Sequence, residues 1–432
     1  MITVMLCLGF WLTLRTRGMQ VRRLPTMLRT VIHNMLHPAG AGGVPPFKAM
    51  STALAGTIGT GNIVGVATAI AVGGPGAIFW MWVSAFFGMM TKFAEVTLAV
   101  KYRRRDADGR YHGGPMVYIV DGLGHRFKFL AVIFAVCCMA AAFGIGNIAQ
   151  INSISLSLHS AFHVPKIAVG LAVAALCLAV IGGGVKRITD FTGFFVPFMS
   201  IFFTLGAIIV IASHGDRVPA ALLSIVRGAF CFTSAAGGAI GYTAAAAMRF
   251  GVARGVFTNE AGMGSAPIAH ACADVTEPVE QGYFGALEVF FDTIVMCSIT
   301  ALVVLTSGAW LSGNHGDGAD LTARAFGEVM GPLGQIFIAV AVTLFAFCSI
   351  IGWEFYAEQC CKFLTKRRFV LRGYRAAFAL VLIIGSVAGL SAVWGISDTL
   401  NGLMAVPNLL ALLLLSGQVI AAVERYERRN KC

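Results

Sequence analysis

Apolar runs long enough to cross a lipid bilayer follow one another along most of the chain. A transmembrane helix needs about 20 apolar residues, and the 432 residues are 57% hydrophobic, 12% charged and have a mean hydropathy of +0.80. A soluble domain carries about 25% charged residues, so that class is excluded. We predict an all-α integral membrane protein with about eleven spans, near residues 2–14, 48–72, 76–100, 128–156, 167–185, 191–213, 226–250, 283–311, 332–358, 373–394 and 400–423.

Lysines and arginines collect on one side of the predicted membrane. The net charge of +12 would suit a nucleic-acid ligand, but all except four of the 32 Lys and Arg residues fall on the same side of the membrane. This asymmetry is the positive-inside signal, so we expect contact with lipid and not with nucleic acid. It predicts an external N-terminus and a cytoplasmic C-terminus. The four exceptions are Lys166, Arg217, Arg227 and Arg324.

The segment Gly56–Asn62 reads G-T-I-G-T-G-N inside the second apolar run. Glycine is a weak helix former, and an opened helix in hydrocarbon is tolerated only where it is buried in protein or lines a cavity. The freed N–H groups can hold a carboxylate and the freed carbonyls a cation. This pattern indicates the binding site of a transporter. The alternative is that these glycines only allow helices to pack closely.

A second glycine-rich segment, Gly237–Gly241, lies early in the second half of the chain. After a peripheral first span, two sets of five spans remain, and their topologies are inverted because five is odd. Matched breaks in inverted halves are typical of secondary transporters. We therefore expect an N-terminal helix and basic loop over 1–47, repeats over 48–213 and 214–423, and a cytoplasmic tail over 424–432.

Other classes of membrane protein have less support. An integral-membrane enzyme of lipid or acyl transfer is the alternative, but it needs a nucleophile with a base, or a metal cluster, at the interface. The sequence has no such constellation near a span end, and its 11 cysteines lack zinc-site spacing. A channel is also disfavoured, because its pore is usually formed by a ring of symmetric subunits. No phosphate loop is present, which disfavours ATP-driven transport. We expect a protein that is not an enzyme and has no cofactor.

Long motifs along nearly the whole chain resemble the alanine/glycine:cation symporter family, the sodium:alanine symporters. They lie at Thr52–Trp82, Thr91–Glu95, Phe143–Ser153, Arg254–His270, Leu287–Val295 and Ile350–Glu358. The resemblance implies a leucine-transporter-type fold, a five-plus-five inverted repeat with one extra N-terminal helix. It implies uptake of small neutral amino acids such as alanine and glycine, coupled to sodium or protons by alternating access. A bacterial or archaeal inner membrane and a single functional chain are the corresponding expectations.

A zwitterionic amino acid needs partners for an anion, a cation and a side chain. The backbone N–H groups of Thr60, Gly61 and Asn62 follow the glycine break and are expected to face the carboxylate. Carbonyls of Gly237 and Gly238 could receive the ammonium group.

The resemblance extends the predicted site to the fourth and ninth spans. It places Gln150 at the substrate, the alternative being a helix–helix hydrogen bond. It places Trp353 over the side-chain pocket, the alternative being an interfacial aromatic residue. Ser349 lies one helical turn before Trp353 on the same face, and Glu354 stands where the family often has a small polar residue.

Two cation sites follow from the same resemblance. Ala55 and Ile58 carbonyls would form one site with Ser349. Thr57 and Asn62, with the substrate carboxylate, would form the other.

Charged residues inside the predicted spans form two pairs at helical spacing, Lys92 with Glu95 and Glu288 with Asp292. Intramembrane charges are costly and are expected to have partners. We expect Lys92 to pair with Glu95 on its own helix. Glu288 and Asp292 are expected to pair with an arginine, Arg249 or Arg254, in a cytoplasmic gate that also includes Glu260. The alternative for this pair is a cation site. Because neither pair lies in the glycine segment, we expect both to lie outside the substrate site.

Overall fold

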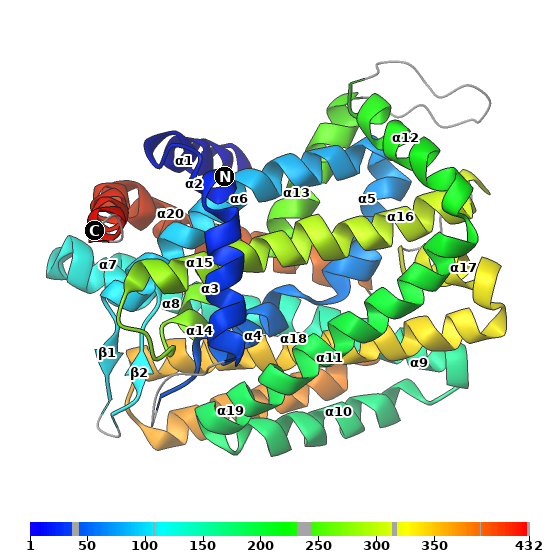
Figure 1. Ribbon diagram of the computed structural model, residues 1–432. Coiled ribbons are helices and arrows are strands. Elements are labelled where there is room, and N and C mark those ends of the chain that lie inside the picture. Colours follow the sequence, from blue (N-terminus) through cyan, green and yellow to red (C-terminus); the bar gives the residue numbers. More distant parts are fainter. Residues whose placement is uncertain (37–42, 107–108, 231–243, 313–317, 389, 430–432) are drawn as a thin grey trace.

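The computed structural model is a bundle of long helices with one short β-hairpin at one end (Figure 1). It describes residues 1–36, 43–106, 109–230, 244–312, 318–388 and 390–429. The hairpin pairs β1 (Arg104–Arg105) with β2 (Tyr111–His112) in antiparallel orientation. The prediction of an all-helical membrane protein is confirmed by this architecture.

The first half of the chain, which includes the helices on either side of the glycine segment, forms the elements from α1 to η4. They are α1 (Ile2–Arg15), α2 (Met19–Arg22), α3 (Leu24–Leu36), α4 (Pro46–Thr57), η1 (Gly61–Gly65), α5 (Val66–Gly73), α6 (Gly76–Lys101), α7 (Pro115–Leu123), η2 (His125–Phe127), α8 (Lys128–Phe143), η3 (Gly144–Ile148), α9 (Ala149–Phe162), α10 (Lys166–Ile181), α11 (Gly184–Ser213) and η4 (Gly215–Arg217).

The second half supplies the helices that pack against them. They are α12 (Val218–Phe230), α13 (Ala244–Asn259), α14 (Ala266–His270), α15 (Pro278–Val289), η5 (Phe290–Cys297), α16 (Ser298–Ser307), η6 (Ala309–Ser312), α17 (Gly318–Met330), α18 (Pro332–Leu364), α19 (Arg368–Gly385) and α20 (Leu390–Arg429).

Within the described ranges, six helical segments are long and apolar enough to cross a membrane. The pair formed by α4 and η1–α5 adds a seventh span, bent by 55° at the break. Two shorter apolar helices, α1 and α10, lie where spans are predicted. The count of about eleven stays a prediction, because the middle of the predicted span 226–250 lies outside the described residues. The second glycine break, Gly237–Gly241, lies there too.

Small residues allow α13 and α15 to pack closely against α6. A Cβ atom added to Gly255 of α13 would lie 2.1 Å from the Ser84 hydroxyl, and one added to Gly285 of α15 would lie 2.6 Å from Val96. Lipid tails are as apolar as the helix surfaces, so the hydrophobic effect does not drive membrane helices together. Such helices associate instead through close van der Waals packing of their backbones, which small residues allow. The glycines therefore bring α15 against α6, and with it the charges that both helices carry.

The buried charges pair between helices, which corrects the expected Lys92–Glu95 pair. Lys92 Nζ lies 3.3 Å from Glu288 Oε1, and both side chains are fully buried. His270 Nε2 donates to the other Glu288 oxygen at 2.8 Å, and Gln281 Nε2 bonds His270 Nδ1 at the same distance. The expectation of an arginine partner for Glu288 is wrong, because the packing of α15 on α6 brings a lysine closer.

Glu95 and Glu260 have other partners. Glu95 Oε1 accepts hydrogen bonds from the Gly264 amide at 3.0 Å and from Asn408 Nδ2 at 2.6 Å. Glu260 accepts a hydrogen bond from the Ser265 hydroxyl. Both glutamates therefore bind the turn that joins α13 to α14, where Glu260, Gly262 and Gly264 adopt positive φ angles.

We predict that Lys92→Met lowers the stability of the folded protein by about 3–5 kcal/mol, because it leaves the Glu288 carboxylate buried without its cation. Lys48→Met is the control: it breaks a pair with Asp190 whose side chains are 40% and 48% exposed, and such surface pairs contribute about 0–1 kcal/mol. The measurement is thermal unfolding of the full chain in detergent. Adding Glu288→Gln to Lys92→Met should recover part of the loss, and equal melting temperatures for the two single variants would contradict the assignment.

Candidate functional site

The predicted glycine break opens the helix between α4 and η1. Gly59 N–H, which would continue the helix by bonding the Ala55 carbonyl, donates instead to Asn62 Oδ1 at 3.1 Å. Thr60 N–H donates to Gln150 Oε1 of α9 at 3.4 Å. Asn62 N–H bonds the Gly59 carbonyl in place of that of Ile58. The carbonyls of Ala55 and Ile58 thus lose their regular helical donors, as a cation site requires.

Helix α18 supports the end of α4 from the other side. Ser349 Oγ donates to the Gly56 carbonyl at 3.1 Å, and Tyr356 Oη donates to the Ala53 carbonyl at 3.1 Å. A Cβ atom added to Gly59 would lie 3.1 Å from Ser349 Oγ and 3.4 Å from Gln150 Oε1. The structure therefore brings Gln150 and Ser349 to the break, although they lie about 90 and about 290 residues further along the chain.

Asp292 also lies at this site. The expectation that it lies outside, because it is not part of the glycine segment, is corrected by the structure. Asn62 Nδ2 donates to Asp292 Oδ1 at 2.8 Å, and the Thr293 hydroxyl donates to Asp292 Oδ2 at 2.7 Å. The expected arginine is not among its described hydrogen-bond or ion-pair partners. A carboxylate buried in a membrane protein is costly and usually functional. The sequence favours a gate over a cation site for Asp292, so it does not place this residue at the break. Its presence inside a span was the available signal, but its nearness to Asn62 depends on tertiary packing.

Three π-helical segments meet around the opened helix. They are η1, which begins at the break, η3, which ends two residues before Gln150, and η5, which contains Asp292. η1 packs against η5, and η3 packs against α18. A π-helical turn widens a helix by one residue and occurs often at functional sites. Here the widened turns direct Asn62, Gln150 and Asp292 toward one region inside the bundle.

Trp353 is fully buried within α18, so the alternative of an interfacial aromatic residue is wrong. A Cβ atom added to Gly146 of η3 would lie 2.2 Å from Trp353 Cβ, so the tryptophan packs directly on the segment before Gln150. Gln150 Nε2 also donates to the Ile145 carbonyl at 3.1 Å. The amide of Gln150 therefore contacts two backbone groups and bridges the break to η3.

Several groups at the break remain available for a ligand. Thr60 Oγ1 is buried and has no hydrogen-bond partner among the described residues. Buried polar atoms without partners are rare in folded proteins and often mark ligand or water sites. Thr60, Asn62, Gln150 and Ser349 are all at most 4% exposed, so these side chains are shielded from solvent. Gly61 is partly accessible, and Gly237 and Gly238 lie outside the described residues.

Glu354, next to Trp353, differs from Asp292 in its surroundings. Its side chain is fully buried, and neither carboxyl oxygen has a hydrogen-bond partner among the described residues. The two acids therefore differ in their hydrogen bonds: Asp292 bonds the broken helix, whereas Glu354 is buried without such a bond among the described residues. Burial alone does not distinguish a ligand-binding carboxyl from a structural one.

Comparison with known proteins agrees with this geometry. The sequence matches the sodium:alanine symporter family over residues 1–432. It is 44% identical over 435 residues to the sodium/alanine symporter AgcS of Methanococcus maripaludis, covering 100% of this chain and 95% of the relative. The chain belongs to the sodium:alanine symporter family. As a member it is a multi-pass membrane transporter and not an enzyme, so the alternative of lipid or acyl transfer is not supported.

Solved structures identify the fold as the leucine-transporter type. The crystal structure of MhsT in complex with L-phenylalanine has a TM-score of 0.62 at 13% identity, covering 87% of this chain and 90% of that one. A Na⁺-coupled sialic acid symporter in a substrate-bound, outward-open state has a TM-score of 0.56 at 15% identity, covering 93% and 86%. These likenesses confirm the predicted fold class.

We predict that Gly59→Ala weakens substrate binding at least tenfold, because the added methyl group enters the space between Ser349 and Gln150. Gly65→Ala is the matched control on the same broken span, since a Cβ atom there meets nothing within 4 Å. Binding of labelled alanine to the purified, full-length variants measures the difference. Equal alanine affinities of the two variants would show that the opened helix is not part of the substrate site.

Proposed function

We propose that this protein is a secondary active symporter that takes up small neutral amino acids, such as alanine and glycine, together with sodium or protons. The observation that carries the proposal is the opened helix at Gly56–Asn62. Its backbone groups bond side chains of α9 and α18 as well as its own Asn62. The Asn62 side chain also bonds Asp292 of η5. A transporter of this architecture binds its solute at such a break and alternates access around it. Similarity to the sodium/alanine symporter AgcS supports both the solute and the ion.

The substrate carboxylate is proposed to bind the start of η1. The N–H groups of Thr60, Gly61 and Asn62 lie at the positive end of the η1–α5 segment, which favours an anion. The Thr60 hydroxyl, which has no partner among the described residues, adds a donor to this group. Gln150, which already bonds Thr60 N–H at 3.4 Å, would turn toward the substrate. Trp353, packed on Gly146, would limit the side chain to a small one.

The first proposed cation site lies at the end of α4. It combines the Ala55 and Ile58 carbonyls, which have lost their helical donors, with Ser349 Oγ, which reaches the adjacent Gly56 carbonyl at 3.1 Å. Oxygen atoms of this kind suit a hard cation. The negative end of the α4 dipole points to the same place.

The second proposed site is extended by Asp292. The sequence suggested Thr57 and Asn62 with the substrate carboxylate, and Asp292 lies 2.8 Å from Asn62 Nδ2. A cation there would be held between a protein carboxylate and the substrate carboxylate, with Thr293 orienting the former at 2.7 Å. The bound cation and the substrate carboxylate attract each other strongly in a low-dielectric site. Binding of the ion therefore raises the affinity for the substrate, and binding of the substrate raises the affinity for the ion.

The remaining expectations complete the proposal. The protein would lie in the inner membrane of a bacterium or archaeon, with its N-terminus outside and its C-terminus in the cytoplasm. A single chain would transport, with repeats over 48–213 and 214–423 rocking around the site, residues 1–47 lying peripherally and 424–432 forming a tail. The broken α4–η1–α5 span near the start of the first repeat supports this division.

Coupled uptake is tested with the full chain in proteoliposomes. Labelled alanine should accumulate above equilibrium when an inward sodium or proton gradient is imposed, and each gradient applied alone identifies the driving ion. Dissipating that gradient should release the accumulated alanine. Equilibration that is independent of both gradients would contradict symport.

We predict that Asp292→Asn raises the ion concentration for half-maximal uptake at least tenfold, because it removes the negative charge and keeps the side-chain size. Glu354→Gln is the matched control: it neutralises another fully buried carboxyl that has no bond to the broken helix among the described residues, and it should change this concentration less than about twofold. A tenfold change corresponds to about 1.4 kcal/mol. Equal ion dependence of both variants would exclude Asp292 from the cation site.

A further inference from the structure

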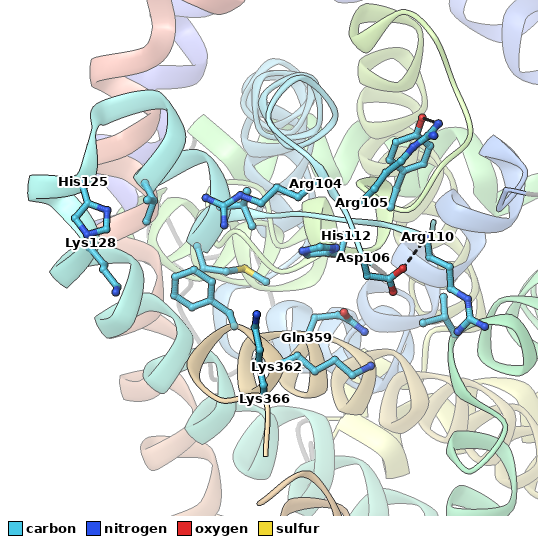
Figure 2. Close-up of a pocket in the computed structure, with 16 residues that line it drawn as sticks. Arg104, Arg105, Asp106, Arg110, His112, His125, Lys128, Gln359, Lys362 and Lys366 are labelled. Carbon is cyan, nitrogen blue, oxygen red and sulfur yellow. Dashed lines mark hydrogen bonds between the residues drawn. The ribbon is translucent and has the colours of Figure 1, made fainter. Parts of the chain in front are cut away.

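A large basic cavity lies at the end of the bundle that carries the β1–β2 hairpin (Figure 2). It has a volume of about 840 Å³ and is lined by the hairpin, α7, the start of α8 and the end of α18. Its cationic lining residues are Arg104, Arg105, Arg110, Lys128, Lys362 and Lys366, joined by His112 and His125. It is separate from the glycine break, and the transport proposal does not use it.

The cavity holds many more positive than negative groups. Among the described residues, Asp106 is the single carboxylate in its lining, and it accepts a hydrogen bond from the Arg110 amide at 2.9 Å. Two of the cations bond carboxylates that lie outside the lining. Arg104 binds Asp121 through Nη2 at 2.5 Å, and Lys362 binds Glu358 at 2.6 Å. Glu358 also binds Arg375 at 2.6 Å. Within the described part of the chain, these three acids therefore leave at least three of the six Lys and Arg charges uncompensated.

The β1–β2 hairpin also holds several cationic side chains close together. Its register sets Arg104 opposite His112, where the guanidinium disfavours a positive charge on the imidazole. The Arg103 guanidinium lies 3.7 Å from the centre of the Tyr111 ring, and that of Arg105 lies 4.6 Å from it. Burial lowers the pKa of His112. Nearby Asp106 opposes this shift, whereas Arg104 and Lys362 add to it. An anion in the cavity would relieve this repulsion and favour protonated His112.

The alternative is that these residues are ordinary solvated charges of a basic membrane face. Their convergence favours a ligand, because Figure 2 shows Arg104, Lys128, Lys362 and Lys366 around one space although they come from three different parts of the chain. Guanidinium and ammonium groups bind phosphate through short, charge-assisted hydrogen bonds. The same cavity has an apolar wall made by Met116, Val117, Val120 and Phe363, which suits the glycerol and first methylenes of a lipid.

We propose that this cavity binds a phosphate-bearing anion, supplied either as the head group of an anionic phospholipid or as a soluble phosphate compound. Bound there, the anion joins the β1–β2 hairpin to the end of α18. Because α18 also carries Ser349 and Trp353, occupancy of the cavity stabilises one position of the helix that borders the break. The ligand is thus structural or regulatory and is not the transported solute.

The test uses the full chain in detergent with two probes, phosphatidylglycerol and inorganic pyrophosphate, and measures binding by native mass spectrometry and by the shift in melting temperature. The double variant Arg110→Gln/Lys128→Gln removes two lining charges. Arg372→Gln is the control: it removes an exposed arginine of the neighbouring α19 that does not line the cavity. Melting without either probe verifies that all variants fold.

We expect the wild-type protein and Arg372→Gln to bind at least one probe, and the double variant to bind it at least tenfold more weakly. Binding of phosphatidylglycerol alone identifies a lipid as the source, and binding of pyrophosphate alone identifies a soluble compound. Equal affinity of the double variant and the control, or no binding of either probe to the wild-type protein, would overturn the proposal. None of these readouts depends on transport, so they do not test the symport mechanism.

Discussion

The structure depends on how the backbone is satisfied where a membrane helix opens. A buried N–H or carbonyl without a partner costs about 1–3 kcal/mol, and lipid offers no replacement. At the break the N–H of Gly59 bonds Asn62 and that of Thr60 bonds Gln150, while Ser349 bonds the Gly56 carbonyl. Each of these side chains substitutes for a helical partner. The break therefore depends on α9 and α18, which bring Gln150 and Ser349 to it, and on Asn62 of the broken span itself.

The same packing accounts for the buried charges. Glycines on α13 and α15 allow both helices to approach α6, which brings Glu288 to within 3.3 Å of Lys92. One helical turn further along the same span, Asp292 reaches Asn62. One helix therefore carries an ion pair that holds the bundle together and a carboxylate that faces the opened segment. A displacement of this helix would change both contacts, which gives a physical route from ion binding to movement of the bundle.

Much of the fold could be predicted from the sequence because its signals are local. Long apolar runs identify spans, and Gly59 and Gly61 within one run identify a break, since both depend only on neighbouring residues. The motifs of the sodium:alanine symporter family added Gln150, Ser349 and Trp353, which lie far from the break in sequence. Lys92 was paired wrongly with Glu95, because helical spacing reports neighbours on one helix and says nothing of the helix packed against it.

The sequence by itself determined that this chain enters a membrane, opens one of its spans at Gly56–Asn62 and belongs with amino-acid symporters, because composition, glycine placement and motifs are properties of the chain. Only the tertiary structure decided that Asp292 lies at the opened helix, that Lys92 bonds Glu288, and that the loop cations converge on one cavity. The physical reason is that each of these is a contact between distant segments. The distance between the contacting groups is set by how closely the helices pack, and no local sequence pattern encodes that packing.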